Sequence, residues 1–131
     1  MSYQYCFLDY ETFNLADLKD VGVDNYSKHP SAGISCLGWA LDIEEVVAWL
    51  PHLGPPPRKL IDAMRDPRII KIAWNSAFEY NITRYVLPKY LSPEMKDWFV
   101  PLEQWRDPIV LAHNISLPGR LEVVASFERD C

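Results

Sequence analysis

The stretch Phe7-Leu8-Asp9-Tyr10-Glu11-Thr12 closes an apolar run that begins at Tyr3 and is typical of a buried β-strand. Buried strands do not ordinarily end in two acids. Side chains alternate along a strand, so Asp9 and Glu11 project from the same side, about 6–7 Å apart at the backbone. Two carboxylates held in this way repel each other, and a divalent cation between them relieves the repulsion. The pair is therefore a candidate half of a magnesium or manganese site, unless the two acids only mark where the strand meets solvent.

Length and composition narrow the class of protein. A chain of 131 residues, 49% hydrophobic and 24% charged, predicts a single globular domain. The net charge of −5 argues against a general nucleic-acid coating protein, which would be basic, but not against an enzyme whose acidic centre meets phosphate through cations. The sequence has no run of 18 apolar residues and no secretory signal, so we expect no membrane span. Cys6, Cys36 and Cys131 have no metal-ligand spacing and are expected to be free thiols in the cytoplasm.

Apolar runs predict the remaining elements. Three further strands are expected at Ile34–Leu41, Val46–Leu50 and Ile69–Trp74, the first two joined as an antiparallel hairpin by the turn Asp42–Glu45. Helices are expected over Arg58–Arg65 and from Asn75-Ser76 to about Tyr85, with shorter helical segments at Asn14–Gly22, Leu91–Val100, Asp107–His113 and Leu121–Arg129. Loops are expected at Tyr26–Ser31 and Pro51–Pro57. This order predicts an α/β fold with a mixed sheet, whose first three strands are antiparallel, and flanking helices.

Two short motifs carry a resemblance to a known family. Asp9–Leu15 (DYETFNL) and Asn75–Glu79 (NSAFE) resemble the first two motifs of DEDD-type 3′–5′ exonucleases, nearest to the proofreading domains of family A DNA polymerases from phages. The first motif, D-x-E-T-x-x-L, fits throughout, whereas Glu79 stands where the second motif usually has Asp. Similar stretches of the phage branch recur along nearly the whole chain, at Lys28–Ser31, Leu37–Leu41, Trp105–Asp107 and Leu117–Glu122. The resemblance implies a ribonuclease H-like fold over residues 1–131.

The resemblance also implies a chemistry, in which two Mg²⁺ or Mn²⁺ ions about 4 Å apart hydrolyse the terminal phosphodiester of DNA. Asp9 would bridge both ions, Glu11 would hold one ion and orient the attacking water, and Glu79 would hold the second. The residues expected to contact the 3′ end of single-stranded DNA are Thr12, Phe13, Leu15, Asn75 and Phe78.

The local sequence leaves alternatives for these positions. Ser76-Ala77-Phe78-Glu79 also fits a capping box, in which Glu79 returns to the start of its helix. Leu15 could lie in the core. Asp107 precedes a proline and so could cap its own helix rather than support the metal ligands.

The family's third motif, a Tyr or His shortly before a final metal-binding Asp, has no match in this chain. The late acids are Glu122, Glu128 and Asp130, and none has such a partner before it. We therefore expect a domain truncated at its C-terminus, a piece completed by a polymerase chain or a C-terminal remainder, or an inactive descendant. If phage-encoded, it would act in the cytoplasm of a bacterial host. The alternative function is a non-catalytic ribonuclease H-like module that binds a protein partner or a DNA end.

Overall fold

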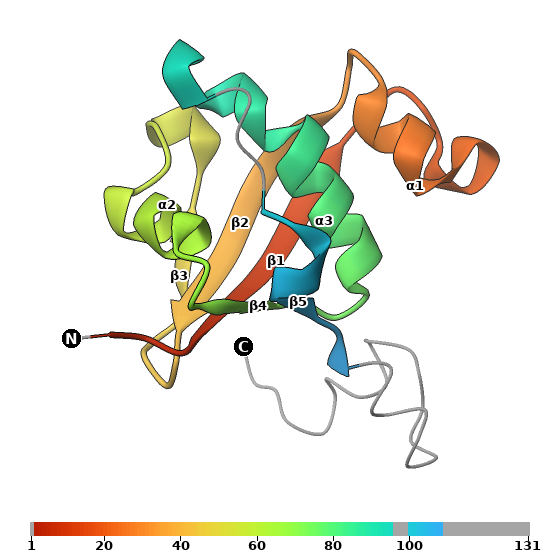
Figure 1. Cartoon of the computed structure of the whole chain (residues 1–131). Helices are drawn as coiled ribbons and strands as arrows, with labels where there is room; N and C mark the ends of the chain where they lie inside the picture. The colour runs from red at the N-terminus through yellow and green to blue at the C-terminus, as the bar shows by residue number, and fades with distance from the viewer. Residues whose placement is uncertain (1, 96–99, 109–131) are drawn as a thin grey trace.

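The computed structural model describes residues 2–95 and 100–108. The centre of this region is a five-stranded mixed sheet (Figure 1). Along the sheet the strand order is β3-β2-β1-β4-β5. The strands are β1 Tyr5–Phe13, β2 Gly33–Leu41, β3 Val47–Trp49, β4 Ile70–Ile72 and β5 Trp105–Arg106. β1 pairs with β2 and β2 with β3 in antiparallel fashion, whereas β1–β4 and β4–β5 are parallel pairs. This α/β arrangement is compatible with a ribonuclease H-like fold.

The predicted hairpin and the central position of the first strand are confirmed. In the turn between β2 and β3, Asp42 adopts a left-handed backbone conformation (φ 53°). Its carboxylate accepts hydrogen bonds from the backbone N–H groups of Gln4 and Tyr5, which stabilise the turn. β3 and β4 are three residues each, shorter than their apolar runs. β5 was not predicted, because a two-residue strand is too short to show any periodicity.

Three α-helices accompany the sheet. α2 spans Arg58–Arg65, as predicted, and α3 spans Ser76–Tyr85. α1 spans Leu18–Lys28, so the helical segment predicted at Asn14–Gly22 is confirmed from Leu18 onward, whereas the loop predicted at Tyr26–Ser31 was wrong for Tyr26–Lys28. Gly22 does leave the helical conformation (φ 81°), but the helix resumes after it, supported by the Lys28–Asp24 ion pair at 3.0 Å.

Short 3₁₀ turns account for other departures from the predicted pattern. One at Pro51–Leu53 lies in the proline-rich segment expected to have no regular structure, and one at Pro93–Met95 replaces the start of the helix expected at Leu91–Val100. Two others are Leu87–Tyr90 and Leu102–Gln104. Residues 96–99 and the helices expected beyond Pro108 lie outside the described residues. No helix in the described ranges is long and apolar enough to cross a membrane.

The hydrophobic core lies on one face of the sheet. Cys6, Leu8 and Tyr10 of β1 are buried, and they belong to one cluster with residues from all three helices, namely Tyr26, Leu60, Met64 and Ile82. The intervening residues of β1 are exposed. We call this second side the outer face; it carries Tyr5, Phe7, Asp9 and Glu11 of β1, together with Cys36, Gly38 and Ala40 of β2 and Ile70 and Ile72 of β4, which are their partners in the register.

Candidate functional site

Asp9 and Glu11 lie on the outer face of β1, as the alternation of the strand predicts. Gly38 of β2 is the register partner of Asp9, so β2 places no side chain directly opposite this acid, and the nearest side chain there is Val46. A hollow of about 400 Å³ opens there, and Asp9 is its only acidic lining residue among those described. Its other walls come mainly from apolar residues of five segments, including Phe7, Ala40, Val46, Ile72 and Pro108.

Glu79 approaches the same strand from α3. Its Oε2 accepts a 3.1 Å hydrogen bond from the backbone N–H of Tyr10, the residue between Asp9 and Glu11. β4 pairs with β1 only as far as Phe7, so beyond that point no strand of the described residues lies along this edge of β1. Glu79 therefore satisfies a backbone donor that the sheet leaves without a strand partner. The side chain is 5% exposed.

The capping box that the sequence offered as an alternative role for Glu79 is not formed at the start of α3. Asn75, the residue before the helix, has a left-handed backbone (φ 61°), and no side-chain cap comes from it. Instead, the carboxylate of Asp107 accepts hydrogen bonds from the backbone N–H groups of Asn75 at 3.0 Å and Ser76 at 2.8 Å. Asp107 follows β5, so it ties the end of that strand to the helix that carries Glu79. Asp107 is therefore a helix cap, as the sequence allows, but the helix that it caps among the described residues is α3, whereas the helix expected to begin at Asp107 lies outside them.

The three acids act on one another electrostatically. Burial, opposed by the hydrogen bond from the Tyr10 N–H and aided by the charges of Asp9 and Glu11, raises the pKa of Glu79 to about 8. Burial and then the charge of Glu11 raise the pKa of Asp9. Both shifts have the sign expected where carboxylates share a partly desolvated site, and a bound cation would oppose both.

The fit to a metal ion is partial. Asp9 and Glu11 supply two carboxylates on one face, the ligand type that Mg²⁺ and Mn²⁺ prefer. Within residues 2–95 and 100–108, however, no group of three or more His, Cys, Asp or Glu side chains is arranged to hold a metal ion. Glu79 is directed to the backbone of Tyr10, so it would have to leave that hydrogen bond or share it to act as a ligand.

Thr12, Phe13 and Leu15, three of the residues expected to contact DNA, lie at the end of β1 or just after it. Phe13 is 54% exposed and its ring lies over Gly33, where even a Cβ atom would clash. Leu15 is 91% exposed, so the alternative of a core role for it was wrong. The hydroxyl of Thr12 is 2.9 Å from that of Tyr26, whose ring also packs against Phe78 at a centroid distance of 6.1 Å.

Tyr26 is the residue that the sequence did not single out. Besides its contacts to Thr12 and Phe78, its backbone carbonyl accepts a 2.7 Å hydrogen bond from Asn14. It thus connects α1, α3 and the end of β1. The spacing of Asp24 and Lys28, four residues apart, was the available signal that Tyr26 lies in a helix.

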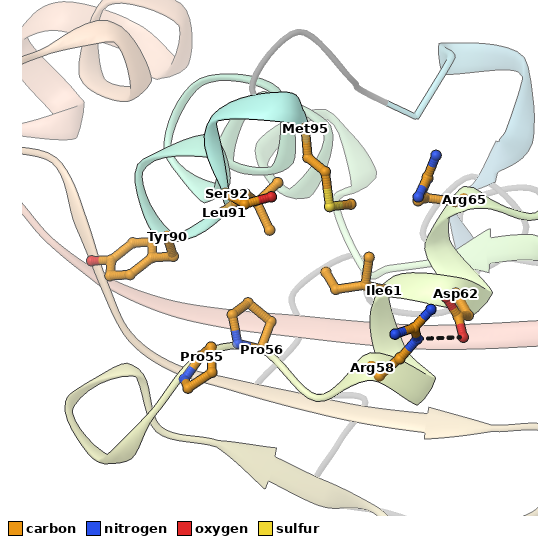
Figure 2. Close-up of a pocket in the computed structure, with 10 residues that line it drawn as sticks. All are labelled: Pro55, Pro56, Arg58, Ile61, Asp62, Arg65, Tyr90, Leu91, Ser92 and Met95. Atoms are coloured by element: carbon orange, nitrogen blue, oxygen red, sulfur yellow. Dashed lines mark ion pairs between the residues drawn. The ribbon is translucent and has the colours of Figure 1, made fainter.

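A second hollow, of about 300 Å³, is separate from the acids. It lies between α2 and the segment Tyr90–Met95, with Pro55, Pro56 and Ile61 among its walls (Figure 2). Its charged rim includes Arg58 and Asp62, which form an ion pair at 3.9 Å. No predicted site residue lines it, so we leave it out of the candidate site.

Comparison with known proteins gives one informative similarity. The chain is 31% identical over 119 residues to a protein named DNA polymerase from Bacillus phage SP02. The match covers 90% of this chain but 17% of the phage protein, so the chain spans about a sixth of that relative's length. No protein-family model matches the chain. The similarity supports a relationship to part of a phage DNA polymerase.

Proposed function

We propose that the chain is a 3′–5′ exonuclease domain of the proofreading type, with a ribonuclease H-like fold over residues 1–131, associated with a DNA polymerase. The observation that carries the proposal is the meeting of Glu79 with β1 between Asp9 and Glu11. The two sequence motifs lie far apart in the chain, and the fold brings them together at one strand. The similarity to part of a phage DNA polymerase supports the same assignment.

The proposed substrate is the 3′ end of single-stranded DNA. Phe13 and Leu15 have exposed apolar side chains and follow Asp9 and Glu11 in the chain. Such side chains can contact a DNA base of any sequence. Thr12, held to Tyr26, would fix the end of β1 against α1. Asn75 and Phe78 lie at the start of the helix that carries Glu79.

The proposed reaction breaks the terminal P–O3′ bond by attack of water on phosphorus. Mg²⁺ or Mn²⁺, when bound, would supply hydroxide near neutral pH and stabilise the leaving oxygen. Asp9 and Glu11 would hold the ions, with Glu11 also orienting the water. Glu79 would have to give up its proton to join them, because its pKa of about 8 keeps it largely neutral below that pH. A remainder of a polymerase or another chain would supply the acid of the third motif.

A second candidate is a non-catalytic ribonuclease H-like module that binds a protein partner or a DNA end. Two observations favour it. Glu79 already accepts a hydrogen bond from the backbone N–H of Tyr10, and the described residues include no group of three or more side chains arranged to hold a metal ion. In this case Asp9 and Glu11 would be surface carboxylates on the outer face and would bind no metal ion.

Digestion of a 3′-labelled single-stranded oligonucleotide with Mn²⁺ separates the two functions. The exonuclease proposal predicts slow release of the terminal nucleotide by the 131-residue chain, and loss of that release in Asp9→Ala. The rate should lie well below that of complete enzymes, since losing one positioned acid–base group costs about 10²–10⁴-fold. Equal release by both proteins would contradict the proposal. DNA binding without release, unchanged in Asp9→Ala, would favour the non-catalytic module.

A further inference from the structure

A cluster of cations lies where α1 and α3 pack side by side (Figure 1). Lys28 is the last residue of α1, and its amine lies 5.0 Å from the centre of the Tyr85 ring. The central carbon of the Arg84 guanidinium lies 5.3 Å from the centre of the same ring, and the guanidinium donates a 2.9 Å hydrogen bond to the hydroxyl of Tyr80. One aromatic ring of α3 therefore holds two cations that come from different helices.

Lys89 adds a third positive charge to this cluster. Its amine donates hydrogen bonds to the backbone carbonyls of Pro30 at 3.2 Å and Ala32 at 2.6 Å. Pro30 follows closely after Lys28 in the chain, so Lys89 lies beside the end of α1. We call Lys28, Arg84 and Lys89 the basic patch. All three residues are exposed.

The charge of the basic patch is opposite in sign to that of the whole chain. Asp24 faces the patch and forms an ion pair with Lys28 at 3.0 Å, so the three positive charges there meet one negative charge. The whole chain carries a net charge of −5, which repels a polyanion, whereas the patch attracts one. A DNA strand carries a phosphate at every nucleotide and can therefore meet several of these cations at once. The half-buried rings of Tyr80 and Tyr85 lie among the cations, an arrangement that also suits stacking on bases.

The basic patch is continuous with the residues proposed to contact the 3′ end. The segment between α1 and β2 is bonded to the chain that follows β1, because Ser31 Oγ donates to Asn14 Oδ1 at 2.7 Å and accepts from the backbone N–H of Leu15 at 2.9 Å. On the other side, Glu79 and Arg84 lie on the same helix, separated by about 7.5 Å at a rise of about 1.5 Å per residue. A strand whose 3′ end lies beside the acids can therefore reach the patch with its upstream nucleotides.

We propose that the basic patch contacts the phosphodiester backbone of single-stranded DNA upstream of its 3′ end. This role rests on the proposed function, because it requires a 3′ end beside Asp9 and Glu11. Lys28 and Arg84, held against Tyr85, each pair with a phosphate, and such contacts orient the strand without reading its sequence. The amine of Lys89 is bound to two carbonyls, so this residue contributes through its charge.

Binding of a fluorescently labelled single strand of about 12 nucleotides, without divalent ions, tests this role. Fluorescence anisotropy gives the affinity of the full 131-residue chain at a series of salt concentrations. The plot of log affinity against log salt concentration should become shallower by about 0.7 in Lys28→Gln and in Arg84→Gln, the value for one phosphate contact on a single strand. Arg58→Gln is the matched control, because it removes one exposed positive charge from α2 and changes the net charge equally. Its slope should equal that of the wild type.

The two patch variants alter exposed side chains on different helices, so either one suffices if the other does not fold. Unchanged slopes in the folded patch variants would overturn the proposal. So would an equal change in Arg58→Gln, since net charge alone would then explain the binding, and so would absence of binding by the wild type. The outcome is separate from that of the Mn²⁺ digestion, because a chain that releases no nucleotide can still show the expected slopes, and a chain that releases nucleotides can lack them.

Discussion

Replacing Glu79 by Gln removes one titrating group and leaves an amide oxygen to accept the hydrogen bond from the Tyr10 N–H. The folded protein holds the pKa of Glu79 near 8, against an ordinary value of 4.5 in an unfolded chain. Between these values the folded state binds the proton and the unfolded state does not. The free energy of unfolding of the wild type should therefore fall as pH rises through this window, and the variant should lack that part of the pH dependence.

The expected size follows from the same pKa. Each pH unit inside the window costs about 1.4 kcal/mol, so raising the pH from about 5.5 to about 7.5 should lower wild-type stability by on the order of 2–3 kcal/mol relative to Glu79→Gln. Below about pH 4.5 the two proteins should show no relative change with pH, because Glu79 is then protonated in both folded and unfolded chains. Asp9→Asn should lower the upper end of the window and leave its lower end in place, since the Asp9 charge contributes to the raised pKa of Glu79 in the folded state.

Urea denaturation at a series of pH values, without divalent ions, measures this difference. Glu103→Gln is the matched control, because it makes the same change at an exposed position. Parallel stability curves for wild type and Glu79→Gln across pH 5.5–7.5 would refute the reasoning, since they would mean that Glu79 is not buried beside Asp9 and Glu11.

Two further predictions concern the supports of the site. Asp107→Ala removes the acceptor for the backbone N–H groups of Asn75 and Ser76, and in urea denaturation it should lower the free energy of unfolding by about 1–2 kcal/mol. The control Asp62→Ala, on the exposed side of α2, should change the free energy of unfolding by less than about 0.5 kcal/mol. Equal effects of the two substitutions would contradict the role of Asp107 as a helix cap. Lys71 is fully buried, its amine donates to the backbone carbonyl of Asp66 and to Gln104, and burial lowers its pKa to about 8. The unfolded chain therefore binds the Lys71 proton more tightly, and wild-type stability should rise relative to Lys71→Met, by on the order of 3 kcal/mol, between about pH 8 and 10.5. A relative fall over that range would contradict this reasoning.

The sequence predicted the elements with long, regular patterns. The β2–β3 hairpin, the central position of β1 and the full extent of α2 follow from apolar periodicity and turn residues. The extent of α1 was mispredicted because Gly22 interrupts it, and local patterns do not show that a helix resumes after a kink. β5 exists only through pairing with β4, so no local pattern marks it.

Within the site, the sequence predicted the shared face of Asp9 and Glu11, because strand alternation is a local property. It did not predict the partners of Glu79 and Asp107. Glu79 bonds to a backbone donor 69 positions away, and Asp107 caps a helix that begins 31 positions earlier. The first contact depends on where β4 stops pairing with β1, and the second on the pairing of β5 with β4, both of which are set by tertiary structure.

Manganese binding tests the central claim most directly, namely that Asp9 and Glu11, with Glu79 nearby, form a divalent-cation site. Titration of the 131-residue chain with Mn²⁺, followed by the loss of the free-ion electron paramagnetic resonance signal, gives the affinity without requiring catalysis. We predict weak binding by the wild type, weakened by more than about tenfold in Asp9→Ala and unchanged in Asp62→Ala, which removes an exposed acid of α2. Absence of binding by the wild type, or equal binding by wild type and Asp9→Ala, would contradict the account.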